Sequence, residues 1–403
     1  MQITSPPLAG SVGSAATPSL RGDRNQALDG LRGWAALAVA YYHAILHNDL
    51  SLIQRVLMQP IDNMQSGYDV FAKLTLNTFH GETAVFLFFI LSGAVLRQSL
   101  ARYEPMPEWR FGLSFLLARM ARLYPPVIVC MAVIWVLTLL WPAMGLSGFP
   151  QFSLSQLALN AGLINTNVHG PSTTVQAEML AAPFLFGAYL LQRVYGFPAA
   201  IFCFVLSIYA IEVHWMILDL PNMHSYLYPF MAGMLIAEPR LKAAFAGITL
   251  SSGWIALGVL VFTRLLAYHA SVPAHIAMVI AGAVLVGILL YSPSDRLGAL
   301  LQKPLSQFLG RISFSFYLLN VPVLMAIWTV TDKWSLAANS PVEVGLAVGT
   351  LSTLLTIPFA VASERWVERP GMRLGRMIRN KLRPAPSVHG VSAQVYLGER
   401  APA

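Results

Sequence analysis

About ten stretches of this chain are apolar over a length that would cross a lipid bilayer, which takes roughly 20 residues as a helix. They are residues 33–50, 83–100, 119–141, 176–193, 198–217, 224–237, 251–270, 273–291, 309–330 and 342–362. Lipid offers the backbone no hydrogen-bond partner, and these stretches lack the alternation of barrel strands, so they must be helices. We therefore predict an all-α, polytopic transmembrane helix bundle of about ten spans.

The composition supports a membrane protein. Charged residues make up 11% of the chain and hydrophobic residues 56%. A soluble domain carries roughly 25% charged residues, and a disordered chain is far less apolar. Both classes are therefore excluded for the chain as a whole.

The basic residues are distributed unevenly along the chain. With the N-terminus inside, 22 of the 26 Lys and Arg residues fall on inner segments, and residues 142–175 contain none. Inner loops of membrane proteins are enriched in Lys and Arg, so both termini are predicted to be cytoplasmic. This distribution explains the net charge of +8 without nucleic-acid binding. The cluster from Arg365 to Arg383 fits topology and contact with anionic lipid.

Three regions are expected along the chain. Residues 1–26 and 384–403 are rich in small residues and proline, and we predict that they are disordered cytoplasmic tails. Residues 27–383 would form one membrane domain. Cys130 and Cys203 both lie in apolar runs, which gives neither a disulfide framework nor a cysteine zinc site.

Arg32 and His43 are eleven residues apart in the first span. In a helix they lie on one face, roughly 16 Å apart along the axis. Ionisable groups inside a membrane are costly and usually face a cavity or a partner. The alternative is that Arg32 only sets topology and that His43 bonds a neighbouring carbonyl.

Arg119 and Arg122 lie on one helical face at the inner end of the third span, because they are three residues apart. Two planar guanidinium groups suit a phosphate or pyrophosphate. Topology alone would also explain both residues.

Two further features are weaker. Glu178 would open the fourth span on the outer side, where a helix N-terminus also favours a carboxylate. Ser92 and Gly93 end an aromatic stretch that begins at Phe88, and these small residues favour close helix packing.

Together these pieces resemble the acyltransferase-3 family of integral-membrane acyltransferases over roughly residues 25–383. Five motifs carry the resemblance in order: Leu28 to Gly33 with His43, Phe88 to Gly93, Arg119 to Arg122 with Tyr124 and Pro125, Phe308 to Leu318, and Trp366 to Pro370. Each is weak alone, but their order and topology are specific.

The resemblance implies an O-acyltransferase, a transferase of groups other than aminoacyl, in the bacterial inner membrane. The donor would be acyl-CoA, most simply acetyl-CoA, and the acceptor an outward-facing hydroxyl of a glycan or glycolipid. Arg32, Arg119 and Arg122 would bind the donor phosphates. His43 would take the acceptor proton or be acylated itself, and Glu178 would hold the imidazole or orient the acceptor. No hydrolase-like domain is expected after the last span.

Three positions depart from the family pattern. Many members have Trp at the position of Thr174, a polar residue at that of Phe86 and His at that of Asn320. These departures bear on the acceptor more than on the reaction.

Two other classes of function compete with this interpretation. A transporter or flippase would also place charges in the membrane, but no inverted repeat is visible. A metal enzyme could use His43 and His47, which have helix-ligand spacing, with outer histidines. The outer histidines are His80, His169, His214, His224, His269 and His275. No acidic residue stands at ligand spacing to the first pair, so we expect no metal.

Overall fold

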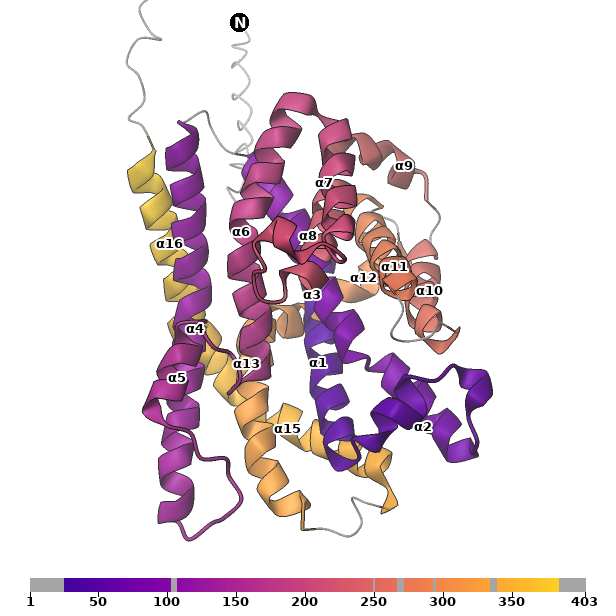
Figure 1. Ribbon diagram of the computed structural model, residues 1–403, viewed down its shortest axis with the longest axis vertical. Coiled ribbons are helices and arrows are strands. Elements are labelled where there is room, and N and C mark those ends of the chain that lie inside the picture. Colours follow the sequence, from indigo (N-terminus) through magenta and orange to yellow (C-terminus); the bar gives the residue numbers. More distant parts are fainter. Residues whose placement is uncertain are drawn as a thin grey trace, which may run out of the picture.

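The computed structural model describes residues 25–102, 107–248, 251–266, 272–292, 295–333 and 339–383. All regular structure in these ranges is helical (Figure 1). The all-α prediction is confirmed. Most of the two predicted tails and His269 lie outside the described residues.

Each predicted apolar stretch corresponds to one helix. These are α1 (Gln26–Asn48), α3 (Gly81–Ala101), α4 (Glu108–Ala143), α6 (Gly170–Tyr195), α7 (Phe197–Tyr209), α8 (Met223–Ile236), α10 (Ser252–Leu266), α11 (Val272–Tyr291), α13 (Pro304–Thr331) and α15 (Pro341–Ser363).

Shorter helices lie between these helices or continue them. These are α2 (Gly67–Thr78), α5 (Leu154–Ala161), α9 (Lys242–Ala246), α12 (Arg296–Leu301), α16 (Arg369–Leu382), η1 (Ile53–Leu57), η2 (Ile61–Asn63), η3 (His214–Ile217), η4 (Pro239–Leu241) and η5 (Glu364–Glu368). The fifth predicted span, residues 198–217, is longer than its helix. α7 ends at Tyr209, and the chain turns where the polar residues Glu212 and His214 interrupt the apolar run.

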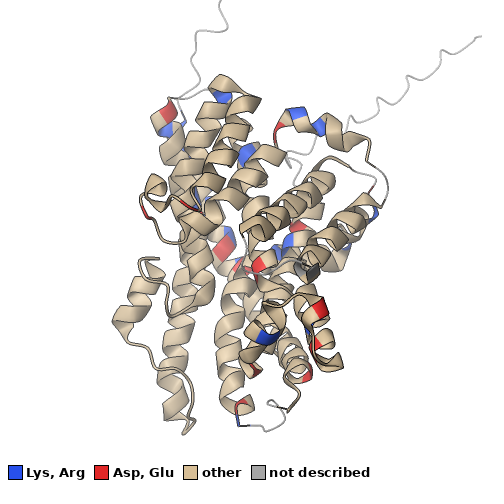
Figure 2. Ribbon diagram, turned by 45° about the vertical axis from the view of Figure 1, so that its right-hand side comes forward, with Lys and Arg blue, Asp and Glu red and all other residues tan. Residues whose placement is uncertain are grey.

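Six helical segments of the described chain are long and apolar enough to cross a membrane. They are Gly67–Ala101, Glu108–Ala143, Gly170–Tyr195, Val272–Tyr291, Pro304–Thr331 and Pro341–Leu382. Figure 2 shows that most of the ribbon carries no charged residue, and that a group of charged residues lies at mid-height within the bundle. A multi-pass membrane protein is thus supported, while the count of about ten spans and the cytoplasmic termini stay predictions.

The helices α1, α13 and α15 pack together at the centre of the molecule. Glycine permits the closest approach: a Cβ on Gly310 of α13 would overlap the carbonyl oxygen of Asp29, and one on Gly33 would meet the Gly310 backbone. Small residues let helix backbones approach closely in this way. This crossing fixes α1, which carries Arg32 and His43, against α13.

A polar network joins α3 and α6 to the turn that follows α8. Arg97 of α3 forms an ion pair of 2.7 Å with Glu238 and donates to the side chain of Gln192, which belongs to α6. Around it, buried side chains of α3, α6, α8 and α11 form the largest apolar core. The bundle therefore has two tightly packed groups of helices with α3 between them.

Pro322 inside α13 explains a buried cluster of polar groups. Proline has no N–H to donate to the carbonyl four residues earlier, which is that of Leu318. This carbonyl accepts instead from His169 Nε2 at 3.0 Å and from the Cys130 thiol at 3.4 Å. His169 and Cys130 thus satisfy the backbone of α13.

We predict that Gly310→Ala destabilises the protein by about 1–3 kcal/mol, because the added methyl group meets backbone that cannot rotate away. Thermal unfolding in detergent measures the change. Gly187→Ala, in α6, is the matched control: a Cβ there meets nothing within 4 Å. It should leave the midpoint unchanged or raise it slightly. Equal midpoints for the two variants would show that the α1–α13 contact is loose.

Candidate active site

A small cavity lies where α1, α3, α4, α6 and α13 meet. Its volume is about 80 Å³, enough for several water molecules or a short acyl group. It is lined by Arg32, Phe88, Phe89, Ser92, Val95, Leu96, Arg119, Arg122, Leu123, Thr174, Val175, Glu178, Ser313, Phe314 and Tyr317. Four of the five residues predicted for the site are in this set.

Three arginines from two helices converge on the cavity. Arg32 comes from α1, and Arg119 and Arg122 come from α4. Topology requires only that basic residues stand on inner segments, and it gives no reason for side chains distant in sequence to share a buried space. The convergence therefore favours a binding role over the topological one.

Arg119 is fixed within the protein. Its Nη2 lies 3.2 Å from Glu178 Oε2 and 3.3 Å from Ser92 Oγ, and its Nε donates to the Glu178 carbonyl at 3.1 Å. The residue is only 8% exposed. A buried guanidinium needs such compensation because removing it from water is costly. Glu178 is therefore the counter-ion of Arg119.

The position of Glu178 differs from the prediction. The helix begins at Gly170, so Glu178 lies more than two turns inside α6 and not in its first turn. The reason is that Pro171 suits the start of a helix, and the polar residues after it are helical as well. Glu178 pairs with Arg119, and the ring of His43 bonds the Val39 carbonyl, so a role of Glu178 in holding the imidazole stays a prediction.

Glu368 is a site residue to which the sequence analysis assigned no role. It is 6% exposed and lies within electrostatic range of Arg122 and Arg32. Ser315 Oγ donates to its Oε2 at 3.3 Å and lies 3.1 Å from Ser363 Oγ. The Trp366 to Pro370 motif was the available sequence signal for Glu368. Nothing in the local sequence indicates that this carboxylate lies near Arg32 of α1 and Arg122 of α4.

Arg122 is the arginine best placed to bind a ligand. Its buried Nε has no hydrogen-bond partner among the described residues. A buried donor without a partner costs roughly 1–3 kcal/mol, so a native protein usually supplies one. A phosphate oxygen in the cavity would do so.

The aromatic motif has two roles. Gly93 packs against the Phe230 carbonyl of α8, as the close-packing interpretation predicts. Ser92 adds the contact to Arg119 described above, which that interpretation did not include. Phe88 and Phe89 line the cavity.

His43 stands outside the cavity lining. Its side chain is exposed. Its Nδ1 lies 2.8 Å from the Val39 carbonyl. Because a carbonyl oxygen only accepts, Nδ1 carries the proton and Nε2 of the neutral ring keeps a lone pair. The carbonyl contact foreseen in the alternative interpretation thus leaves His43 able to act as a base.

A packed layer separates His43 from the arginines. Ala35 and Val39 lie between them on α1 and pack against Ala84 of α3, with Phe88 and Tyr317 alongside. The rings of Phe88 and Tyr317 meet edge to face at 5.4 Å. A continuous passage from Arg32 to His43 is therefore closed in this structure.

The three departures from the family pattern lie at different places. Thr174 lines the cavity and hydrogen-bonds the Tyr317 hydroxyl at 3.2 Å. Phe86 packs against Tyr226, Tyr228 and His275. Asn320 is buried, and it donates to Ser352 and Thr356 of α15. Only Thr174 touches the arginine cavity.

Two of the histidines pair with carboxylates. His47 pairs with Asp332 at 2.8 Å, and His275 pairs with Glu82 at 3.0 Å. Within the described ranges, no three His, Cys, Asp or Glu side chains come together as a metal site.

Glu178→Gln should strongly destabilise the protein, by about 3–5 kcal/mol, because Arg119 would stay buried without its counter-charge. The unfolding midpoint and the yield of folded protein in detergent measure this. Glu108→Gln is the control, since Glu108 and Arg193 are exposed and 3.9 Å apart. It should cost at most about 1 kcal/mol. Similar losses of stability in both variants would contradict the role of Glu178 as the counter-ion of Arg119.

A comparison with protein families identifies the family of this chain. The model described as an acyltransferase domain, which is that of the acyltransferase-3 family, matches residues 25–363. No curated protein and no solved structure matches the chain. The matched residues include all five predicted site residues, from Arg32 to Glu178. The chain belongs to the acyltransferase-3 family.

Proposed function

We propose that this protein is a membrane O-acyltransferase that moves a short acyl group from cytoplasmic acyl-CoA to a hydroxyl of an outward-facing glycan or glycolipid. Acetyl-CoA is the simplest donor. The observation that carries the proposal is the convergence of Arg32, Arg119 and Arg122 on one buried cavity, with the Nε of Arg122 lacking a partner. Family membership supports the acyl transfer itself.

The charges of the cavity suit an anionic donor. Three arginines and the carboxylate of Glu178 line the cavity, and Glu368 lies within electrostatic range of Arg122 and Arg32. Arg119 is paired with Glu178, whereas the Nε of Arg122 has no hydrogen-bond partner among the described residues, so Arg122 is the cation that a phosphate group would meet first. Charge-assisted hydrogen bonds from guanidinium to phosphate are among the strongest in proteins. Glu178 acts by positioning Arg119.

His43 is the proposed catalytic base. Its Nε2 would take the proton of the acceptor hydroxyl as that oxygen attacks the thioester carbonyl carbon. The carbon–sulfur bond then breaks, and the CoA thiolate receives the proton from the imidazolium. The Val39 carbonyl supports this role because it fixes the proton on Nδ1. In the alternative mechanism, the acyl group is first transferred from the donor to His43 and then to the acceptor hydroxyl.

The donor needs an open path between the two parts of the site. The layer of Val39, Phe88 and Tyr317 separates the arginines from His43. Phe88 and Tyr317 are only partly buried, and side chains can change rotamer more readily than backbone can move. We propose that these two rings move aside when the pantetheine arm enters.

The membrane arrangement follows from the distribution of charge. Ten spans with both termini in the cytoplasm put Arg32, Arg119 and Arg122 toward the cytoplasmic side and the end of α1 outside. A bacterial inner membrane has acyl-CoA on one side and envelope glycans on the other, and this asymmetry suits the proposed reaction.

A His43→Ala variant should lose acyl transfer at least about 100-fold, because the acceptor proton has no base. The assay uses purified protein in liposomes, acetyl-CoA labelled in the acetyl group, and glycans extracted from the organism's own envelope. Label on the glycan supports an acyltransferase. Transport of unmodified glycan without label would favour a flippase.

The variant must be shown to fold, by an unchanged elution profile and unfolding midpoint. His214→Ala is the control, since this side chain is exposed, bonds the nearby Ile211 carbonyl and lies against the ring of His224, outside the arginine cavity. Activity near the wild-type level in His43→Ala would exclude the catalytic role.

Replacing Arg122 by Gln should weaken acetyl-CoA binding about tenfold or more, since one charge-assisted contact contributes roughly 1.5–3 kcal/mol. Titration calorimetry in detergent measures the dissociation constant. Arg110→Gln is a matched control on the same helix, where the guanidinium lies over the Trp109 ring. If both variants bind the donor like the wild type, the phosphate site is elsewhere.

A further inference from the structure

A polar pocket lies beyond the far end of α1, away from the arginine cavity. It has a volume of about 460 Å³. Its walls come from η1, η2 and the start of α2, and they are formed by Gln54, Arg55, Gln59, Asn63, Gln65 and Asp69. None of these residues lines the arginine cavity.

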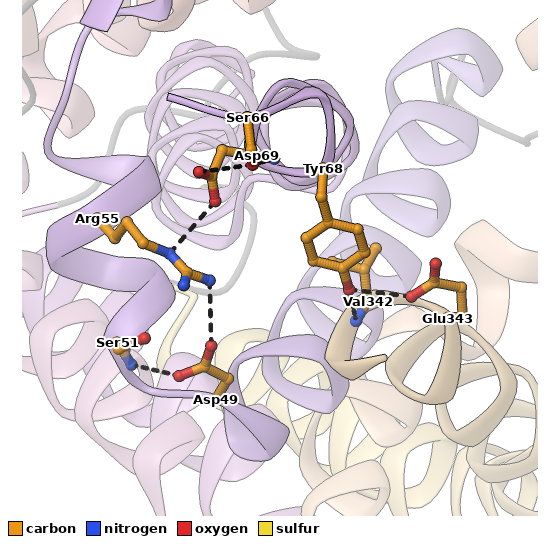
Figure 3. Close-up of polar contacts among 8 residues, drawn as sticks. All are labelled: Asp49, Ser51, Arg55, Ser66, Tyr68, Asp69, Val342 and Glu343. Carbon is orange, nitrogen blue, oxygen red and sulfur yellow. Dashed lines mark hydrogen bonds and ion pairs between the residues drawn. The ribbon is translucent and has the colours of Figure 1, made fainter. Parts of the chain in front are cut away.

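The charged groups in this pocket hold one another in place. Arg55 lies between two carboxylates, with Nη2 3.4 Å from Asp49 and Nε 3.3 Å from Asp69 (Figure 3). Asp49 also accepts from the Ser51 backbone N–H, and Asp69 accepts from the Ser66 hydroxyl. The guanidinium is therefore oriented before any ligand arrives.

A buried lysine fixes one wall of the pocket. Lys73 is completely buried, and its Nζ donates to the carbonyls of Val56, Leu57 and Gln59 at 3.0, 3.1 and 2.7 Å. Burying an ammonium group is costly unless its donors are satisfied. The ammonium group of Lys73 thus holds the backbone that carries Gln54, Arg55 and Gln59.

The same segment is tied to the rest of the bundle. The Tyr68 hydroxyl donates to Glu343 Oε2 at 3.0 Å and accepts from the Val342 N–H at 3.2 Å (Figure 3). Both partners belong to the first turn of α15, which packs against α1. The pocket is therefore a fixed part of the molecule and not an isolated loop.

The chemistry of the lining suits hydroxyl groups. Four carboxamides each offer two donors and one acceptor, and a sugar hydroxyl both donates and accepts. The charges at this end of the molecule balance, because Asp49 and Asp69 stand against Arg55 and the ammonium group of Lys73, which keeps its charge while it donates to carbonyls. With no excess charge among these four residues, the pocket offers no electrostatic attraction to an anionic polymer, and a neutral partner suits it.

We propose that this pocket binds a neutral, hydroxyl-rich saccharide, and that it is the acceptor subsite of the enzyme. The second part rests on the proposed function. His43 and the pocket lie at the same end of α1: five residues, or roughly 7.5 Å of helix, separate His43 from Asn48, and η1 follows directly. A saccharide held here would stand near the proposed base.

Saturation-transfer NMR with the full chain in detergent tests the binding. Maltotetraose is the neutral probe and tetragalacturonate the acidic one. We expect millimolar binding of maltotetraose, with loss of at least tenfold in affinity in Gln54→Ala and Asn63→Ala. Both side chains are exposed, so these variants should fold. Gln151→Ala, an exposed glutamine outside the pocket, should bind like the wild type.

Three outcomes would overturn the saccharide site: no binding of maltotetraose, equal binding in the pocket variants, or tighter binding of tetragalacturonate. The His43→Ala protein separates this proposal from the enzymatic one. It should bind maltotetraose normally while it transfers no acetyl group. If the wild type binds the saccharide but never transfers acetyl groups, the site stands and the proposed function fails.

Discussion

A buried set of opposite charges at the meeting point of α1, α3, α4, α6 and α13 is the constraint on which the account depends. Arg119 contacts Glu178 and Ser92, while Arg122 and Arg32 lie within electrostatic range of Glu368. Buried ion pairs add little stability compared with apolar residues of the same size. A protein so poor in charge therefore gains little from placing five charged groups together, unless they serve a ligand.

The helix packing explains how these groups come to lie together. Close contact at Gly33 and Gly310 fixes α1 on α13, and Gly93 fixes α3 on α8. Motif residues beside these glycines then turn into the cavity: Arg32, Ser92, Ser313 and Tyr317. The same short motifs thus supply both the contact surface and the polar groups of the site.

The sequence predicted much of this, because apolar length and helical spacing are local properties. Each of the ten apolar stretches corresponds to one helix in the described residues, and Arg32, Arg119, Arg122 and Glu178 share one cavity. Contacts between distant residues were harder to predict. The pairing of Glu178 with Arg119, the return of Glu368 toward Arg122 and the aromatic layer before His43 depend on how helices are rotated about their axes. The burial of Lys73 was not predicted, since nothing local shows that three carbonyls surround it.

The central claim is that the arginine cavity and His43 are two ends of one donor site. A cryo-EM structure with a non-hydrolysable acetyl-CoA analogue tests it most directly. The account predicts phosphate density beside Arg122 and Arg32, the acyl end near His43 Nε2, and displaced rings of Phe88 and Tyr317. Nucleotide density elsewhere, or the analogue bound with those rings still packed between its acyl end and His43, would contradict it.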